Sequence, residues 1–106
     1  MLTRIFGFAR GLINPKSAPP QNVISGRVEI ERNGKTAYLE YTLAGNILGL
    51  IHTEVPSELR HLGLAAALAE RALNWAREEG YKVDIVCPLV LDYIAKHPEY
   101  ADLVMR

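Results

Sequence analysis

The chain has 106 residues, 49% of them hydrophobic, and its 12 basic and 12 acidic residues balance. This length suits one domain with one core. The balanced charge gives no general field for a polyanion, and no apolar run approaches the ~20 residues that cross a bilayer, so nucleic-acid and membrane binding are disfavoured. The single cysteine, Cys87, excludes an internal disulfide and a cysteine-rich metal site, and favours a cytoplasmic location.

Residues 1–22 differ in composition from the rest of the chain. They include Arg4, Arg10 and Lys16, no acidic residue, and two adjacent prolines near the end of the segment. Basic, acid-free segments occur as organelle-targeting signals, but glycines and prolines interrupt any amphipathic helix here. We interpret the segment as a short apolar arm that packs on the domain or on a partner, and we assign the domain itself to residues 23–106.

The first regular part of the chain predicts three strands. Apolar and polar side chains alternate over 24–31 and again over 37–43, and 47–55 is a third, largely apolar segment. The Asn33-Gly34 pair between the first two is the strongest short-range hairpin signal, because both residues tolerate positive φ. Three strands joined by tight turns predict an antiparallel meander.

After the third strand the hydrophobic period becomes helical. Alanine and leucine recur at helical spacing over 64–76, and Gly80 follows at the position of a helix C-cap. Alternation over 82–87 predicts a fourth strand, and Pro88 begins a short helix over 89–96. Strands that flank a helical crossover should be parallel. The order βββαβα therefore predicts an α/β (α+β) fold: an antiparallel meander, a parallel βαβ unit and a short C-terminal helix.

The junction between the third strand and the long helix is a candidate anion-binding site. The first amides of a helix have no partner within it, and the helix dipole adds positive potential there. Gly63 and Ala65 leave room for a diphosphate to approach the backbone, and Arg60 adds charge at the rim. On this pattern alone, a helix start at which Gly63 and Ala65 merely pack closely is equally consistent.

Several motifs taken together resemble the GNAT superfamily of acyl-CoA-dependent N-acetyltransferases. They are Val55-Pro56-x-x-x-Arg60-x-x-Gly63-x-Ala65-x-x-Leu68, the preceding His52-Thr53-Glu54, Cys87, and Tyr93-Ile94-x-x-x-Pro98. The combination is most similar to a minimal branch of stand-alone domains of about this size, and it covers roughly residues 24–104. The resemblance implies a GNAT-like fold that uses acetyl-CoA or coenzyme A and acts on an amine or protein acceptor. We expect no metal site.

The resemblance also implies where the cofactor binds. The amides of residues 60–65 would bind the coenzyme A diphosphate, and the pantetheine arm would run between the third and fourth strands, which splay apart in this superfamily. Ligands in general enter at the carboxyl ends of parallel strands, which agrees with this placement. The candidate cofactor-binding residues are Val55, Arg60, His61, Leu62, Gly63, Leu64 and Ala65.

Three residues are candidates for catalysis. Glu54 lies where superfamily members often hold a general base, although a solvated strand-end carboxylate is an equal reading. The resemblance places Cys87 beside the thioester, where it either takes part in acyl transfer or is a buried small hydrophobe. Tyr93 corresponds to a tyrosine that often protonates the leaving thiolate, or it packs in a partly buried position. His52 shares the face of Glu54 and could relay a proton.

We therefore expect an acetyl-CoA-dependent N-acetyltransferase that acts on an amine, free or on a protein. The alternatives are a non-catalytic module that binds coenzyme A and an interaction protein whose glycine loop is only structural. Full-sized members of the superfamily build the amine pocket from additional N-terminal helices and a further C-terminal strand, most of which this sequence lacks. Its acceptor site should be shallow, or completed by a partner, which makes a homodimer a candidate assembly.

Overall fold

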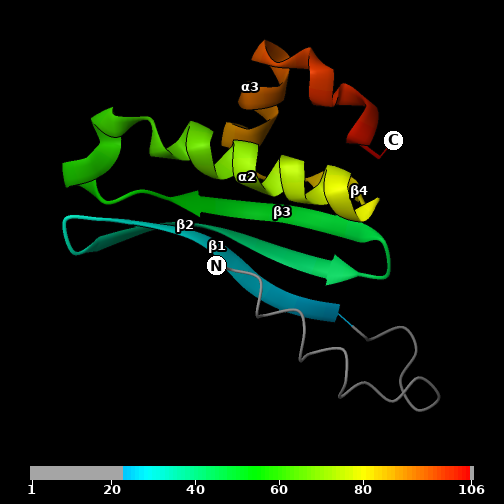
Figure 1. Ribbon diagram of the computed structural model, residues 1–106, viewed down its shortest axis with the longest axis horizontal. Coiled ribbons are helices and arrows are strands. Elements are labelled where there is room, and N and C mark those ends of the chain that lie inside the picture. The colour runs from blue at the N-terminus through cyan, green and yellow to red at the C-terminus, as the bar shows by residue number, and fades with distance from the viewer. Residues whose placement is uncertain (1–22, 106) are drawn as a thin grey trace.

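The computed structural model describes residues 23–105 (Figure 1). Its elements are β1 (Val23–Arg32), β2 (Lys35–Ala44), β3 (Ile47–Glu54), the 3₁₀ helix η1 (Ser57–Leu62), α2 (Leu64–Glu79), β4 (Lys82–Ile85), α3 (Pro88–Lys96) and the 3₁₀ helix η2 (Pro98–Leu103). The predicted order βββαβα and the α/β fold class are confirmed. The interpretation of residues 1–22 as an arm lies outside the described residues.

Tight turns build the antiparallel meander of β1, β2 and β3. Asn33 and Gly34 adopt φ values of 53° and 77°, as the two central residues of a type I′ hairpin turn do. β1 then pairs with β2 over all 10 of its residues without a register shift. The hairpin predicted from the Asn-Gly pair is therefore confirmed.

A bulge changes which side chains β3 directs toward the core. Its pairing with β2 shifts between Glu40 and Tyr41, which leaves Ile51 as an extra residue on β3. Beyond the bulge Thr53 is buried, at 8% exposure, while His52 is exposed on the opposite face. The bulge thus sets the orientation of the last residues of β3, which carry the candidate site.

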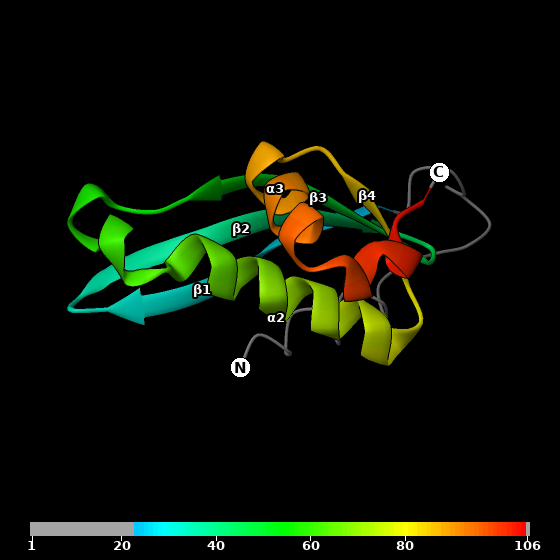
Figure 2. The same ribbon diagram turned by 90° about the horizontal axis from the view of Figure 1, so that it is seen from above.

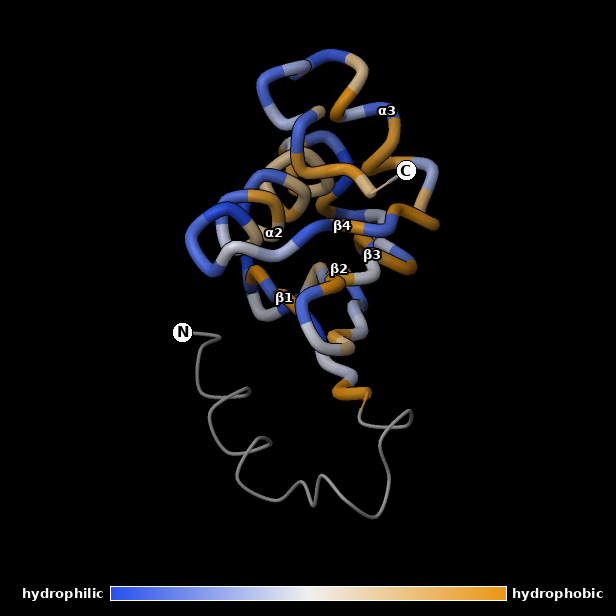
Figure 3. The backbone as a smooth tube through the Cα atoms, turned by 90° about the vertical axis from the view of Figure 1, so that its right-hand side faces the viewer, coloured by the Kyte–Doolittle hydropathy of each residue, from blue (hydrophilic) through white to orange (hydrophobic). Residues whose placement is uncertain are grey.

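β4 completes a sheet of order β1-β2-β3-β4 and is parallel to β3. Both α2 and α3 lie on one face of this sheet (Figures 1 and 2). Seen from the end of the molecule, α2 lies over β1 and β2, and α3 lies over β3 and β4 (Figure 3). Among the described elements no helix covers the opposite face, which we call the open face.

The core lies between the sheet and the two helices. Its fully buried side chains come from every layer and include Leu39, Leu48, Leu50, Leu59, Leu68, Leu73, Val83, Cys87 and Val90. Complete burial of one such leucine contributes about 1.5–3 kcal/mol. Gly80, at φ 79°, ends α2 as predicted. No helix within residues 23–105 combines the length and apolar character needed to span a bilayer.

The C-terminal segment is fastened to α2 and β4. The Arg77 guanidinium donates to both carboxylate oxygens of Asp102, at 3.2 and 3.0 Å, and thereby lowers the pKa of that carboxyl. Lys82 Nζ donates to the Asp102 carbonyl at 2.9 Å, and the Met105 amide donates to the Val83 carbonyl at 2.8 Å. These contacts hold η2 against α2 and so position α3, which borders the site.

We expect Tyr100→Phe to destabilise the fold by about 1 kcal/mol, because the Tyr100 hydroxyl donates to Asn74 Oδ1 at 2.8 Å in a part-buried contact. Urea unfolding of Tyr100→Phe, of Asn74→Ala and of the double variant measures the contribution of this bond to the free energy of unfolding. The effects should be less than additive, since each substitution removes the same interaction. Strict additivity would show that the bond contributes nothing.

Candidate functional site

A cavity of about 330 Å³ opens where β3, η1, α2 and α3 converge. Its lining residues are Thr53, Glu54, Val55, Arg60, Gly63, Ala65, Ala66 and Leu89. Four of the seven candidate cofactor-binding residues and one candidate catalytic residue are therefore brought to one concave surface. This surface lies at the carboxyl end of β3, where ligands of parallel strands are expected.

The parallel strands diverge beside this cavity. β3 and β4 pair from Ile47 to Leu50 only, and the pairing ends with two amides, of Val86 and Cys87, that both donate to the Leu50 carbonyl at 2.9 and 3.0 Å. β3 continues to Glu54 without β4 beside it. The result is the splay between the third and fourth strands that the resemblance implied.

The segment between β3 and α2, expected to be a loop, forms η1 instead. The Leu59 amide donates to the Pro56 carbonyl at 2.8 Å, and the Leu59 side chain is 1% exposed, so η1 is fixed to the core. In a 3₁₀ helix each amide donates to the carbonyl three residues earlier. The amides of residues 60–62 thus have partners within η1, which leaves the free amides at the start of α2.

The start of α2 is open to an anion. Gly63 adopts φ 73°, and the first helical bond runs from the Ala67 amide to the Gly63 carbonyl at 3.1 Å. The amides of residues 64–66 therefore have no acceptor within the helix. The first turn of α2 contains no acidic residue that would offset the positive end of the helix dipole. A Cβ at Gly63 would meet no atom within 4 Å, so the backbone conformation, not crowding, favours glycine there.

Arg60 connects η1 to the end of β3. Its Nε donates to the Val55 carbonyl at 3.0 Å, which holds the guanidinium at the rim of the cavity. The side chains of the other three cofactor-binding candidates lie outside the lining. His61 and Leu62 are exposed, and Leu64 is buried in the core at 4% exposure.

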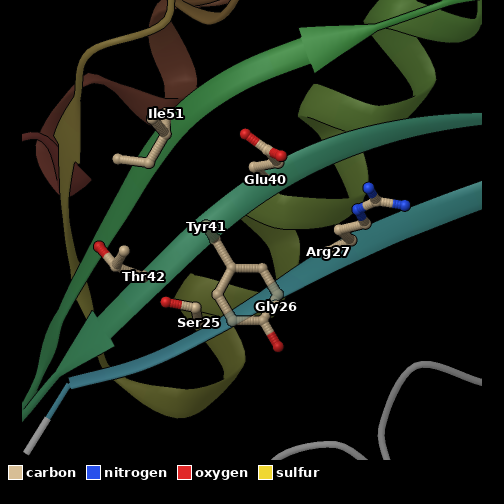
Figure 4. A pocket seen from close by; sticks show the side chains of 7 residues that line it. All are labelled: Ser25, Gly26, Arg27, Glu40, Tyr41, Thr42 and Ile51. Carbon is tan, nitrogen blue, oxygen red and sulfur yellow. The ribbon is translucent and has the colours of Figure 1, made fainter.

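Glu54 reaches both the cavity and the open face. It lines the cavity, and its Oε1 accepts a hydrogen bond from His52 Nε2 at 3.1 Å. His52 is in turn paired across the sheet with Glu40. Glu40 lines a second hollow, of about 390 Å³, on the open face, where Ile51 and Thr42 are its neighbours on β3 and β2 (Figure 4). Polar side chains therefore form a path from this hollow toward the cavity, and within it His52 and Glu54 are hydrogen-bonded to each other.

Cys87 lies behind the cavity wall. It is the N-cap residue of α3, two positions beyond the end of β4, whereas the sequence predicted that it would end the strand. It is 2% exposed, and its Sγ is hydrogen-bonded to Thr53 Oγ1 at 3.3 Å. Thr53 lines the cavity and Cys87 does not, so the threonine side chain lies between the thiol and the cavity.

Tyr93 belongs to an aromatic cluster at the other end of α3. Its ring stacks on His97 at a centroid distance of 4.1 Å and lies 6.1 Å from that of Tyr100. Burial, followed by the nearby Glu70 carboxylate, raises the pKa of Tyr93. The structure does not bring Tyr93 to the cavity lining.

The sequence reasoning did not select three lining residues: Thr53, Ala66 and Leu89. Thr53 is buried because of the bulge in β3, which no sequence pattern announced. Leu89 is 50% exposed at the start of α3. The sequence indicates it only by its position directly after Pro88, which begins the helix. Ala66 follows Ala65 in the free first turn and was available to the same argument.

We expect the Cys87 thiol to react with a thiol reagent about 100-fold more slowly in the native protein than in urea, because access requires local opening of the core. The rate of release of the coloured leaving group measures this directly. Equal rates in the native and unfolded protein would place the thiol in the open cavity.

A mixed sheet whose parallel strands diverge beside a free helix N-terminus is the architecture of an acyltransferase domain of the GNAT type. Residues 27–103 match the family described as GCN5-related N-acetyl-transferase. The chain belongs to this family, whose domains in general transfer acyl groups from acetyl-CoA.

Curated relatives share part of the chain. It is 38% identical over 63 residues to Protein NATD1 of Gallus gallus and of Mus musculus, and likewise to that of Homo sapiens. The match covers 58% of this chain and 57% of the first two proteins, so it spans little more than half the length of these relatives.

Proposed function

We propose that this domain binds acetyl-CoA in the 330 Å³ cavity and transfers the acetyl group to an amine, free or on a protein. The observation that supports this most is the set of unpartnered amides at the start of α2, on a cavity that also contains the Glu54 carboxylate. The free amides on one wall can bind an anion, and the Glu54 carboxylate on the other can accept a proton.

The residues of the cavity fit a diphosphate. The amides of residues 64–66 would donate to its oxygens, and the α2 dipole would favour its charge. Gly63 and Ala65 keep side chains away from the backbone, and the Arg60 guanidinium adds a charge-assisted bond at the rim. The pantetheine arm would then occupy the space where β4 leaves β3, which directs the thioester toward the end of β3.

Glu54 is the proposed general base. The acceptor nitrogen must lose a proton as it forms the amide bond, and a carboxylate at the cavity wall can accept that proton directly or through a water molecule. The hydrogen bond from His52 orients the Glu54 carboxylate. Tyr93, expected to protonate the departing thiolate, does not line the cavity, so we propose that it acts in this role through a water molecule.

We propose that Cys87 assists from behind the wall instead of forming a covalent acyl intermediate. Its thiol is buried and hydrogen-bonded to Thr53, which itself borders the cavity. A nucleophile would need to reach the thioester, and this thiol would first have to displace the threonine. Cys87→Ala should therefore lower turnover much less than removal of the base.

The acceptor is proposed to approach from the open face. Glu40 borders the hollow there, and His52 links that side of the sheet to Glu54. Carboxylates along this path favour a cationic amine. The residues that line this hollow all belong to β1, β2 and β3, so a protein acceptor or a second subunit would complete the site.

The second candidate is a module that binds coenzyme A without catalysis. The observation that favours it is that neither Cys87 nor Tyr93 lines the cavity. Calorimetry with acetyl-CoA, followed by measurement of coenzyme A release in the presence of a panel of amines and lysine peptides, separates the two. Heat of binding with release above the background supports transfer, binding alone supports the module, and no binding contradicts both.

A further inference from the structure

β1 has one long edge that no other element of residues 23–105 pairs with. The strand order makes β1 and β4 the two edges of the sheet. The β4 edge is partly covered, because Val83 pairs with Val104 and accepts a hydrogen bond from Met105. β1, in contrast, has 10 residues, no proline and no described neighbour on its outer side. A long uncovered strand is a template for pairing with another chain.

Alternate residues of β1 direct their backbone groups to this edge. Arg32 and Lys35 flank the two-residue turn, and the residues at these positions of such a turn are hydrogen-bonded to each other. Because the register is uninterrupted, the backbone N–H and C=O groups of the even-numbered residues of β1 are hydrogen-bonded to β2. The backbone groups of residues 25, 27, 29 and 31 therefore face the outer edge. Consistent with this, the Glu31 carbonyl accepts a bond from its neighbour's side chain, Arg32 NH1, at 2.9 Å.

The charges on this edge are self-complementary about Val28. Arg27 and Glu29 lie on the open face with side chains 46% and 52% exposed. If the β1 strand of a second copy pairs antiparallel with Val28 opposite Val28, each Arg27 lies opposite a Glu29. Ser25 then lies opposite Glu31. All four of these residues direct backbone groups outward, so hydrogen bonds and charges are satisfied in the same register.

The neighbouring registers do not satisfy both the outward-facing hydrogen bonds and the charges. Pairing centred on Arg27 brings two guanidinium groups together, and pairing centred on Glu29 brings two carboxylates together. Pairing centred on Ile30 places Glu29 opposite Glu31, and pairing centred on Gly26 leaves Arg27 and Glu29 without opposite charges. A shift to a centre between two residues sets outward-facing groups against groups already bonded to β2.

We propose that this protein forms a symmetric dimer in which the two β1 strands pair antiparallel about Val28. The two four-stranded sheets then form one continuous sheet with the same surface contributed by each copy. Ser25 and Arg27 line the hollow of Figure 4, so in the dimer this hollow borders the seam on the open face. The dimer therefore places a second copy beside the hollow, and its formation does not require acetyl-CoA binding.

Sedimentation equilibrium of the full chain over a concentration series tests the dimer. The mass of the wild type should rise from 11.8 kDa to twice that value as the concentration increases. The single variants Arg27→Glu and Glu29→Arg should each weaken dimerisation at least about tenfold, because each places two pairs of like charges opposite one another. The double variant Arg27→Glu/Glu29→Arg restores both opposite-charge pairs and should dimerise like the wild type. Lys96→Glu on α3 makes the same change in charge away from the edge and should have no effect.

Circular dichroism confirms that each variant is folded, so that a loss of mass reports on the interface. A chain that stays at 11.8 kDa up to about 1 mM overturns the proposal, since that corresponds to less than about 4 kcal/mol of association. A dimer that is unaffected by the single variants, or not recovered by the double variant, also overturns it, because another surface would then form the contact.

Discussion

Ala65→Glu should abolish coenzyme A binding while leaving the domain as stable as the wild type, or slightly more so. Ala65 lies in the first turn of α2 and lines the cavity. A carboxylate there interacts favourably with the helix dipole, which contributes about 0.3–1 kcal/mol to stability. The same carboxylate would occupy the position proposed for the diphosphate, and repulsion should weaken acetyl-CoA binding at least about 100-fold.

The matched control is Ala65→Gln, which has nearly the same shape and no charge. It should retain more of the affinity than Ala65→Glu, and the difference between them isolates the electrostatic part. Isothermal calorimetry gives the affinity and thermal unfolding gives the stability. If Ala65→Glu binds acetyl-CoA as tightly as Ala65→Gln does, the diphosphate does not bind at the start of α2.

Glu54→Gln should lower kcat by about 10²–10⁴, the range expected for loss of a general base. The affinity for acetyl-CoA should change little, because the base acts on the acceptor and not on the diphosphate. Glu54 is an exposed strand-end residue whose carboxylate is hydrogen-bonded to His52, so the fold should tolerate the change. Coenzyme A release under saturating acceptor, alongside calorimetry, separates the two effects.

Two variants calibrate this result. His52→Gln removes the residue that orients the Glu54 carboxylate and should reduce kcat less than Glu54→Gln does. Cys87→Ala should reduce it less still if the thiol is only a supporting group behind Thr53. A Glu54→Gln enzyme with unaltered kcat contradicts the assignment of the base, whereas a Cys87→Ala enzyme with the larger loss would favour a covalent route.

The fold was predictable wherever local chemistry and tertiary packing agree. Asn33-Gly34 encodes the hairpin because positive φ is required at both positions, and Gly80 encodes the end of α2 for the same reason. The alternation over 37–43 places alternate β2 residues in the core, as predicted. At these positions the local preference of the residue and the packing of the core favour the same conformation.

The bulge and η1 could not be predicted because they depend on distant contacts. The register shift at Glu40 and Tyr41 is a property of the pairing between β2 and β3, and neither strand alone signals it. η1 has too few residues to show a helical period, and it is held by the burial of Leu59.

The candidate site was predictable in location but not in detail. The approach of Glu54 and Gly63 to one cavity follows from a strand and a helix that are adjacent in sequence. The burial of Cys87 behind Thr53 does not, because it requires the bulge in β3 and the divergence of β4 together. The order of elements along the chain predicts which of them meet at the cavity. Which side chains face the cavity depends on tertiary packing.

The most direct test follows the backbone amides of residues 64–66 by NMR during a titration with acetyl-CoA. These resonances should show the largest shifts in the chain, since their N–H groups would change from solvent to phosphate acceptors. Amides on the solvated face of α2, near Glu78, should move little. If saturating acetyl-CoA leaves the resonances of residues 64–66 in place, the start of α2 does not bind the cofactor and the proposed acetyl transfer is contradicted.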